Sequence, residues 1–491
     1  AMTGELLVVA GVPAPERRET DFRLRKLFDD IERARALAAG AKLEAVVDAP
    51  IGSSAEDAFM AVPGESFQIV ARFSTPGLHD ADANITLKLP QGWKSEVLKK
   101  EFTGKEVLVR FRVHVPEDAK ITRPYWHRND PERDTLNTID DAQYEGWPFP
   151  PPPVLVISNF DKGQLVGATC MVRYKDSTGA VTIRPVAVAP AFSVLLDPSE
   201  QVIATEDGPS LAGKADLESN LKAKAGDAKG KLKLEAPSGW QPEPPITWLT
   251  FDAKDEQRRV DFKVVPGTRR EGHAEVSSSF TEGEHIYKEG YSVVTRDDLG
   301  TFYYYQPAVQ RVSVVNVKVP HDLKVGYVMG AGDNVATVLE QIGMHVTMIP
   351  AQKLATEELS QYKTIVLGIR AYDTQRDVIA NNQRLLDYVK QGGRLVVQYN
   401  TMGSFGVPID FNAGKYTPYP TTLSRRRVSV EEAPVKILDP SNEIFHYPNE
   451  ISEKDFDGWV QERGLYFMSE WAPEYTPLLE SHDPGEPEQK G

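Results

Sequence analysis

The chain has 491 residues, too many for a single hydrophobic core, and this length predicts roughly three domains. Its formal net charge of −15 argues against a nucleic-acid or anionic-membrane surface, because an acidic protein without a basic patch repels both. No apolar run approaches the roughly 20 residues that a membrane helix needs. The sequence therefore predicts a multidomain protein with no nucleic-acid partner and no membrane span.

The single cysteine, Cys170, excludes an intrachain disulfide and any metal site built from several cysteines. It lies in a strand-like run, 168–174, where we expect a buried and unreactive thiol. So low a cysteine content is compatible with export. We expect an extracytoplasmic location, secreted or periplasmic, rather than a cytoplasmic one.

The first predicted element is a helix of several turns over 18–39. Leu24, Leu27, Phe28 and Ile31 recur at helical spacing, and Gly40 follows as a stop signal. A strand pattern begins soon afterwards. We therefore assign 1–47 to an N-terminal segment with an amphipathic helix.

From there to about residue 319 strand patterns dominate, and one motif occurs twice. The run Leu-Lys-Leu-Pro-Gln-Gly-Trp at 87–93 returns as Leu-Glu-Ala-Pro-Ser-Gly-Trp at 234–240, and each copy is followed by a strand that closes in Val-Pro. The separation is that of a domain rather than of a solenoid repeat. We therefore predict two β-sandwiches of related build, over 48–200 and 201–319.

The two motif tryptophans, Trp93 and Trp240, have two interpretations. The favoured one is a turn whose indole packs over the sandwich core. The alternative is a sugar-stacking platform on the sandwich surface. Burial of both rings would decide for the first.

A long aromatic and proline-rich insertion lies inside the first predicted sandwich, over 124–153. Tyr125 and Trp126 are its candidate aromatic contacts with a ligand. Long ordered loops of this kind are more often functional or interface-forming than idle. The alternative is a loop that seals the sandwich against a neighbouring domain.

The C-terminal region, 320–491, begins with short apolar runs that alternate with helical patterns. Predicted strands cover 325–329, 346–349, 364–367 and 395–398, and the intervening helices end at glycines. This order predicts a doubly wound α/β domain.

Polar residues follow the strands of that predicted sheet. Asp333, Arg370, Tyr372 and Asn400 each come soon after a strand, and parallel strands end at one edge, so we expect them to line a single crevice. Their hydrogen-bonding groups suit a sugar or a carboxylate-bearing ligand. The alternative is a buried structural ion pair between Arg370 and an acidic residue of the C-terminal segment, either Asp457 or Glu462.

Several runs together resemble the long C-terminal region of large bacterial PIG-L (LmbE-like) deacetylases. They are Arg-Pro-Tyr-Trp at 123–126, Gly-Ala-Gly-Asp at 330–333, Gly-Ile-Arg-Ala-Tyr at 368–372, Val-Gln-Tyr-Asn at 397–400 and the thirteen-residue run at 455–467. The resemblance implies two β-sandwiches followed by a flavodoxin-like, class I glutamine-amidotransferase-like or ThuA-like α/β domain. It adds Glu462 and Arg463 to the expected ligand-binding residues, because we expect the segment 459–463 to close over the crevice.

The family's zinc-binding signature, His-Pro-Asp-Asp, is absent from this sequence. The resemblance therefore implies an accessory region that lacks the zinc-dependent N-acetylglucosaminyl deacetylase domain, with no metal, no cofactor and no catalytic residue of its own. The turn at 368–371 also offers neither thiol nor hydroxyl as a nucleophile. The family pattern continues beyond 483–486, so we expect the α/β domain to be truncated at its C-terminal end.

The sequence thus predicts a non-catalytic accessory region that contacts carbohydrate or a glycoconjugate and accompanies an upstream deacetylase domain. Two alternatives stay open. The α/β domain is an independent ThuA-like hydrolase or isomerase, or the whole chain is a structural spacer or oligomerisation module.

Overall fold

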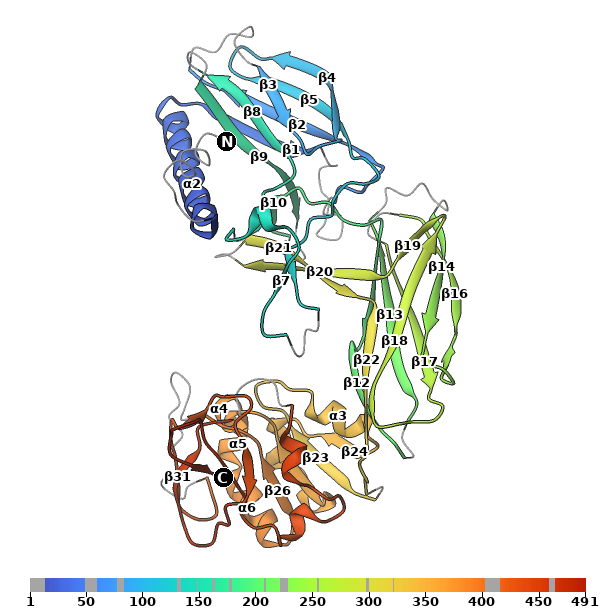
Figure 1. The fold of residues 1–491 in the computed structure, drawn as a ribbon, viewed down its shortest axis with the longest axis vertical. Coiled ribbons are helices and arrows are strands. Elements are labelled where there is room, and N and C mark those ends of the chain that lie inside the picture. Colours follow the sequence, from blue (N-terminus) through green and yellow to red (C-terminus); the bar gives the residue numbers. More distant parts are fainter. Residues whose placement is uncertain are drawn as a thin grey trace.

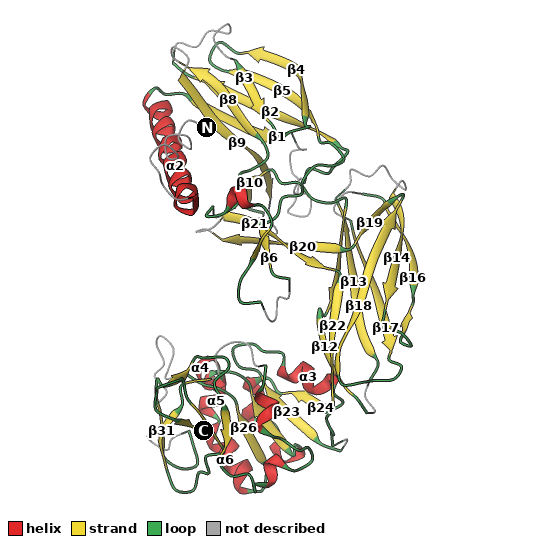
Figure 2. Cartoon of the chain, in the orientation of Figure 1, coloured by secondary structure: helices red, strands yellow, loops and turns green. Residues whose placement is uncertain are grey.

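A computed structural model of the protein describes residues 14–48, 60–76, 84–129, 134–147, 149–160, 164–175, 179–206, 209–220, 228–253, 256–296, 300–320, 322–401, 416–458 and 464–491. Strand accounts for 45% of the structure and helix for 15%. Two β-sandwiches and a C-terminal region follow one another along the long axis (Figures 1 and 2). Within the described ranges, every helix is too short or too polar to cross a bilayer.

The N-terminal helix, α2, spans Ala14–Ala38 and confirms the predicted helix. Its C-terminal end joins the first sandwich core, where Ala36 is buried. The predicted apolar stripe, in contrast, faces solvent: Leu27 is 55% exposed and Phe28 61%. Helical spacing thus identified the helix but not the face that packs.

The first sandwich is an eight-stranded sheet in the order β3-β8-β9-β1-β2-β5-β4, with β10 paired to β9. Its strands are β1 Lys42–Val47, β2 Ser66–Ser74, β3 Ile85–Lys88, β4 Lys94–Phe102, β5 Val107–His114, β8 Leu155–Phe160, β9 Gln164–Lys175 and β10 Val181–Pro185. In β5 alternate side chains are buried, as the period of two requires. One core holds Val156 of β8 and Phe111 of β5, so the two ends of the sheet face each other.

The second sandwich packs two sheets, in the orders β11-β13-β17-β15 and β12-β22-β18-β14-β16, with β19 paired to β18. Its strands are β11 Phe192–Asp197, β12 Glu200–Ala204, β13 Leu211–Ser219, β14 Ala228–Glu235, β15 Gln241–Glu243, β16 Ile246–Phe251, β17 Gln257–Val265, β18 Gly272–Glu282, β19 His285–Tyr287 and β22 Val309–Val315. Phe192 of one sheet lies 4.8 Å from Phe280 of the other, measured between ring centroids. This sandwich therefore begins with β11, before the expected boundary at 200/201.

The repeated Pro-x-Gly-Trp motif forms the same turn in both sandwiches. The backbone N–H of Trp93 donates to the carbonyl of Pro90 at 3.2 Å, and that of Trp240 donates to Pro237 at 2.9 Å. Trp240 is only 8% exposed within its core, and Trp93 packs partly buried against the other core. The core-packing interpretation is therefore confirmed for Trp240, and Trp93 also packs against its core but is only partly buried.

A hairpin and the aromatic insertion connect the two sandwiches. The hairpin consists of β20, Glu289–Arg296, and β21, Gly300–Pro307, and extends from the second sandwich toward the first (Figure 1). Tyr303 of the hairpin is buried with Met60 and Ala187 of the first sandwich and its exit segment. Phe149 of the insertion stacks on Phe302, with ring centroids 5.5 Å apart.

The C-terminal region contains a four-stranded parallel sheet in the order β24-β23-β25-β26. Its elements are β23 Lys324–Val328, α3 Val335–Gln341, β24 His345–Met348, η3 Ala351–Ala355, η4 Leu359–Gln361, β25 Thr364–Leu367, α4 Ala371–Thr374, α5 Arg376–Ala380, α6 Asn382–Lys390 and β26 Arg394–Val397. Apolar residues of β25 are buried, and Leu385 of α6 packs in the same core as Ile365. The strands and helices expected between 323 and 400 are present.

The predicted fold class is nevertheless wrong. Beyond residue 416 the described chain forms small antiparallel sheets rather than further strand–helix units. Their strands are β27 Thr421–Leu423, β28 Arg427–Val428, β29 Val435–Ile437, β30 Gly464–Leu465, β31 Met468–Trp471, β32 Leu479–Ser481 and β33 Gln489–Lys490, with η6 at Glu443–Phe445 and η7 at Glu453–Phe456. The fold is a β-sandwich-rich multidomain one, not one that ends in a doubly wound, flavodoxin-like or amidotransferase-like domain. The spacing of apolar residues correctly predicted single strands and helices. It did not predict how many strand–helix units the C-terminal region contains.

Candidate functional site

Two glycines bring the ends of β23 and β25 into backbone contact. A Cβ on Gly330 would lie 1.9 Å from the carbonyl oxygen of Ile369, and one on Gly368 would lie 2.9 Å from Asp333 Oδ2. The N–H of Ala331 donates to that same Ile369 carbonyl at 2.7 Å. Only glycine leaves room for this approach, so the two turns form one continuous edge.

The side chain of Asp333 links the turn after β23 to the turn after β25 by hydrogen bonds. Its Oδ1 accepts from the hydroxyl of Tyr327 at 2.5 Å and from the N–H of Val335 at 3.0 Å, while Oδ2 accepts from the N–H of Ile369 at 3.3 Å. Burial, with a contribution from Asp333, raises the pKa of Tyr327, so this phenol stays protonated as a donor. Both oxygens of Asp333 are therefore engaged within the protein.

Arg370 has an unusual backbone conformation. It precedes α4 with φ 57° and ψ 30°, the left-handed region that non-glycine residues rarely adopt. A strand followed by a sharp turn with a strained residue and then a helix is the arrangement that presents the nucleophile in hydrolases with a nucleophile elbow. A guanidinium stands in that position here, and it is always protonated and cannot attack a carbonyl.

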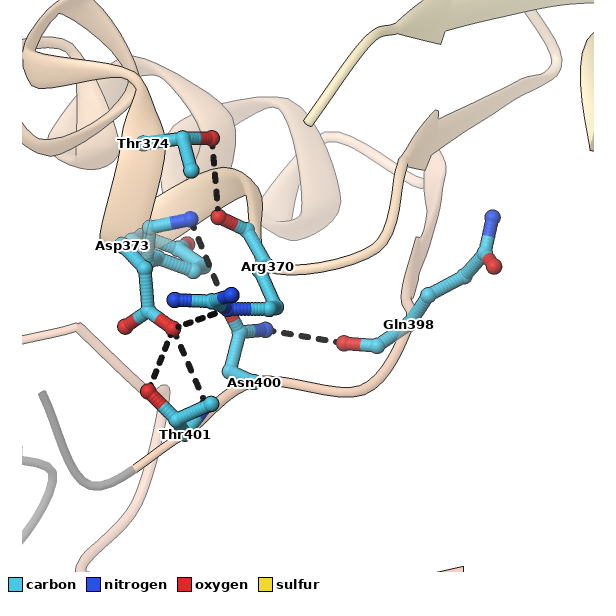
Figure 3. A network of polar contacts seen from close by, with 7 residues as sticks. Arg370, Asp373, Thr374, Gln398, Asn400 and Thr401 are labelled. Atoms are coloured by element: carbon cyan, nitrogen blue, oxygen red, sulfur yellow. Dashed lines mark hydrogen bonds and ion pairs between the residues drawn. The ribbon is translucent and has the colours of Figure 1, made fainter. Parts of the chain in front are cut away.

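Asp373 holds that guanidinium in place (Figure 3). Arg370 Nε donates to Asp373 Oδ2 at 3.0 Å, and the Asp373 side chain is fully buried whereas that of Arg370 is 34% exposed. The same oxygen accepts from Thr401 Oγ1 at 2.5 Å and from Thr401 N–H at 3.2 Å. A carboxylate fixed by the protein thus orients an arginine that reaches the surface.

Tyr372 and Asn400 serve mainly as internal supports of this turn. Tyr372 is 2% exposed, and its hydroxyl donates to Asn382 Oδ1 at 2.6 Å. Asn400 Oδ1 accepts from the N–H of Tyr372 at 3.2 Å, and its Nδ2 donates to the carbonyl of Gln398 at 2.8 Å (Figure 3). Burial raises the pKa of the Tyr372 hydroxyl, which keeps it neutral.

The backbone of Arg370 contacts that of Tyr399, whose ring in turn contacts Tyr466. The Arg370 N–H donates to the carbonyl of Tyr399 at 2.7 Å, and the Tyr399 ring lies 5.8 Å from that of Tyr466. Tyr399 is 40% exposed. Among the described residues, Arg370 and Tyr466 are the only non-glycine ones with positive φ. Such strain persists where the surroundings enforce it and tends to cluster at functional sites.

The remaining predicted residues lie elsewhere. Glu462 and Arg463 fall within 459–463, outside the described residues, and so does the segment expected to close the crevice. Asp457 is exposed, and the ion pair of Arg370 uses Asp373 instead. The predicted set Asp333, Arg370, Tyr372 and Asn400 does meet at one sheet edge, but its role in ligand binding stays a prediction.

Tyr125 and Trp126 belong to the insertion between the sandwiches. The Tyr125 hydroxyl donates to the carbonyl of Trp147 at 2.8 Å, and Trp126 pairs with Ile139 in the short hairpin of β6, Trp126–His127, and β7, Thr138–Ile139. Next to it lies η2, Ala142–Tyr144. Trp147 in turn lies 5.2 Å from Phe22 of α2. The insertion therefore joins α2 to the first sandwich.

Three residues of the site were missed at the sequence level: Asp373, Tyr399 and Tyr466. Asp373 stands three positions after Arg370, a spacing that pairs opposite charges on a helix and was a usable signal. The two tyrosines meet only through the tertiary fold.

No group of three or more His, Cys, Asp or Glu side chains suited to a metal ion occurs in the part of the chain that the structure describes. Cys170 is 0% exposed, as expected, and burial raises the pKa of its thiol to about 12. This thiol is protonated at neutral pH and unreactive.

No protein-family profile matches the chain, and no curated protein matches it either. Similar solved structures include the apo Calx CBD1 domain, with 9% identity and a TM-score of 0.16, which covers 26% of this chain and 98% of that one. WR4, a C. elegans MSP family member, has 14% identity and a TM-score of 0.14 over 25% and 97% of the two chains. A PapD-like domain of human CEP192 has 10% identity and a TM-score of 0.16 over 26% and 87%. TM-scores this low carry no argument about function.

Proposed function

We propose that this chain is a non-catalytic accessory region that binds a saccharide or glycoconjugate through Arg370, at the edge of the four-stranded sheet. On the sequence resemblance, we place it beside a zinc-dependent deacetylase domain of the PIG-L (LmbE-like) kind. Any zinc belongs to that domain and not to this chain.

The observation that carries the proposal is the strained backbone of Arg370 together with the buried carboxylate that holds its side chain. Arg370 is held in a left-handed conformation, and a buried carboxylate fixes its Nε at 3.0 Å. The Arg370 side chain remains 34% exposed, and the exposed residue Tyr399 accepts a hydrogen bond from the Arg370 backbone N–H through its carbonyl. A planar donor fork suits the carboxylate or hydroxyl groups of a sugar, and an exposed aromatic ring suits its apolar ring face.

Binding rather than catalysis follows from the chemistry of this position. The turn has the geometry that presents a nucleophile, but the guanidinium can only donate hydrogen bonds and positive charge. Asp333 is already committed to Tyr327 and to backbone N–H groups.

A saccharide array followed by calorimetry tests the proposal. Arg370→Ala should abolish binding, and Arg370→Lys should restore little of it, because an ammonium lacks the planar fork. Arg376→Ala, which removes an exposed arginine of the neighbouring helix α5, is the matched control and should bind as the wild type does. Equal binding by the Arg370→Ala and Arg376→Ala variants would refute the proposal.

A second candidate function, a rigid spacer, is favoured by the contacts between the sandwiches. Arg123 of the first sandwich forms an ion pair with Glu289 of the hairpin, and its guanidinium lies 4.4 Å from the centroid of Tyr305. Small-angle scattering of an Arg123→Glu variant checks this: a spacer held by these contacts should extend or become flexible. An unchanged scattering curve would contradict it.

A further inference from the structure

The outer face of the second sandwich carries an exposed tryptophan on its edge strand. Trp248 of β16 is 66% exposed, and Ile246, two residues earlier, is 47% exposed. The strand lies at the end of its sheet, on the outer side of the sandwich (Figure 1). Exposed indoles with an apolar neighbour mark interaction sites more often than isolated surface residues do.

The register of the sheet shows which residues surround this indole. Trp248 lies opposite Lys231 of β14, Lys231 lies opposite Thr281 of β18, and Thr281 lies opposite Ile286 of β19. Directly opposed residues share one face of a sheet. The row from Trp248 to Ile286 spans three strand spacings, or about 14 Å.

A second row runs beside the first, since Ile246 lies opposite Lys233 and Lys233 opposite Ser279. We call the surface formed by these two rows the Trp248 face. It consists of Ile246, Trp248, Lys231, Lys233, Thr281 and Ile286, with Ser279 at its end. The alternate residues Leu232 and Phe280 point the other way and are buried in the core.

The Trp248 face is positive although the whole chain is acidic. Three lysines alternate along β14, at 229, 231 and 233, and all three lie on the outer side. Lys233 pairs with Glu235 at 2.5 Å, whereas Lys229 and Lys231 form no ion pair with any described residue. The hydrogen bond from Lys233, with the nearby charge of Lys288, lowers the pKa of Glu235.

We propose that the Trp248 face binds an anionic polysaccharide of the uronate class, at a site separate from Arg370. The indole stacks on the apolar face of a pyranose ring, the lysines pair with its carboxylates, and the Ser and Thr hydroxyls bond to sugar hydroxyls. The length of the rows fits a short run of sugar rings.

The composition of the face favours a glycan over other partners. Protein interfaces are depleted in Lys and Ser, which make up much of this surface. Nucleic-acid sites combine several stacking aromatics with a strongly basic domain, whereas this chain has one exposed indole here and a pI near 5.2.

Affinity electrophoresis of the full chain in gels that contain polygalacturonate or neutral dextran tests the proposal. The wild type should be retarded by polygalacturonate and not by dextran, and the retardation should weaken as NaCl rises from about 0.05 to about 0.5 M. Trp248→Ala should weaken the affinity roughly tenfold or more. Trp248→Phe should retain most of it, and Lys231→Gln should weaken it and reduce the salt dependence.

Tyr447→Ala removes an aromatic ring that is 81% exposed in the C-terminal region and is the matched control, expected to behave as wild type. Each of four results would overturn the proposal: no retardation of the wild type, equal retardation of Trp248→Ala and Tyr447→Ala, tighter binding of single-stranded DNA, or a dimer that Trp248→Ala dissociates. Retardation that Trp248→Ala keeps and Arg370→Ala loses would likewise overturn it, because the glycan would then bind at the edge of the four-stranded sheet and not at the Trp248 face.

Discussion

Replacing Asp373 by Asn probes the support of Arg370 without changing side-chain shape. All three donors, Arg370 Nε, Thr401 Oγ1 and Thr401 N–H, meet the same oxygen of a side chain that is 0% exposed. Hydrogen bonds to a charged group contribute about 1.5–3 kcal/mol each and are roughly twice as strong as neutral ones. An amide oxygen at that position keeps the three bonds but loses about half of their strength. We therefore expect a loss of about 2–4 kcal/mol in local stability, with the lower end favoured because water reaches Arg370.

Hydrogen–deuterium exchange of the segment 364–401 is the suitable assay, because a multidomain chain does not unfold in a single two-state step. The amides of this segment should exchange faster in Asp373→Asn by the factor that corresponds to the lost free energy. Asp457→Asn changes an exposed aspartate in the same region and is the control. Indistinguishable exchange in the two variants would show that the Arg370–Asp373 pair contributes nothing measurable.

Four further outcomes follow from the same structure. Arg370→Gly should be more stable than Arg370→Ala by about 1 kcal/mol in thermal unfolding, because glycine relieves the left-handed backbone; equal stability would show that the turn is unstrained. Trp240→Ala should destabilise its sandwich by about 3–5 kcal/mol in urea unfolding and Trp93→Ala by less, since Trp93 is only partly buried. Hydrogen bonds from the backbone N–H groups of Val430 and Ser429 lower the pKa of Asp483 in the folded protein. The ionised carboxylate therefore stabilises the fold above the unfolded pKa of about 3.9, and this stabilisation is lost as the pH falls through the lower folded pKa. Asp483→Asn should remove this acid sensitivity from the hydrogen–deuterium exchange of residues 428–430. Elemental analysis should find no stoichiometric zinc in the purified chain, and one tightly held zinc per chain would contradict this.

The strands and helices between 323 and 400 could be predicted because each has a period and a stop signal. The glycines after strands gave the turns, and the parallel arrangement then placed Asp333, Arg370, Tyr372 and Asn400 at one edge. The fold class could not be predicted in this way. Whether further strand–helix units follow β26 depends on how the C-terminal part packs, and its strands of two to four residues are too short to show a period.

The sequence also did not show in which direction each side chain points. Tyr372 follows a strand as Arg370 does, yet it is buried and bonds to Asn382. The repeated motif drew attention to Trp93 and Trp240. Trp248 belongs to no motif, and only the pairing of its strand with β14 shows that its side chain lies on the outer face of the sheet. The alternative interpretation paired Arg370 with Asp457 or Glu462 of the C-terminal segment. The structure pairs it with Asp373, three residues further along the chain.

A crystal structure of the chain soaked with the saccharide that binds best in the array tests the central claim most directly. We expect a carboxylate or hydroxyl group of the sugar within hydrogen-bond distance of Arg370 Nη1 or Nη2, with the Nε bond to Asp373 retained and a sugar ring against Tyr399. A sugar bound elsewhere on the C-terminal region, with the Arg370 guanidinium free of it, would contradict the claim and leave Arg370 as a purely structural residue.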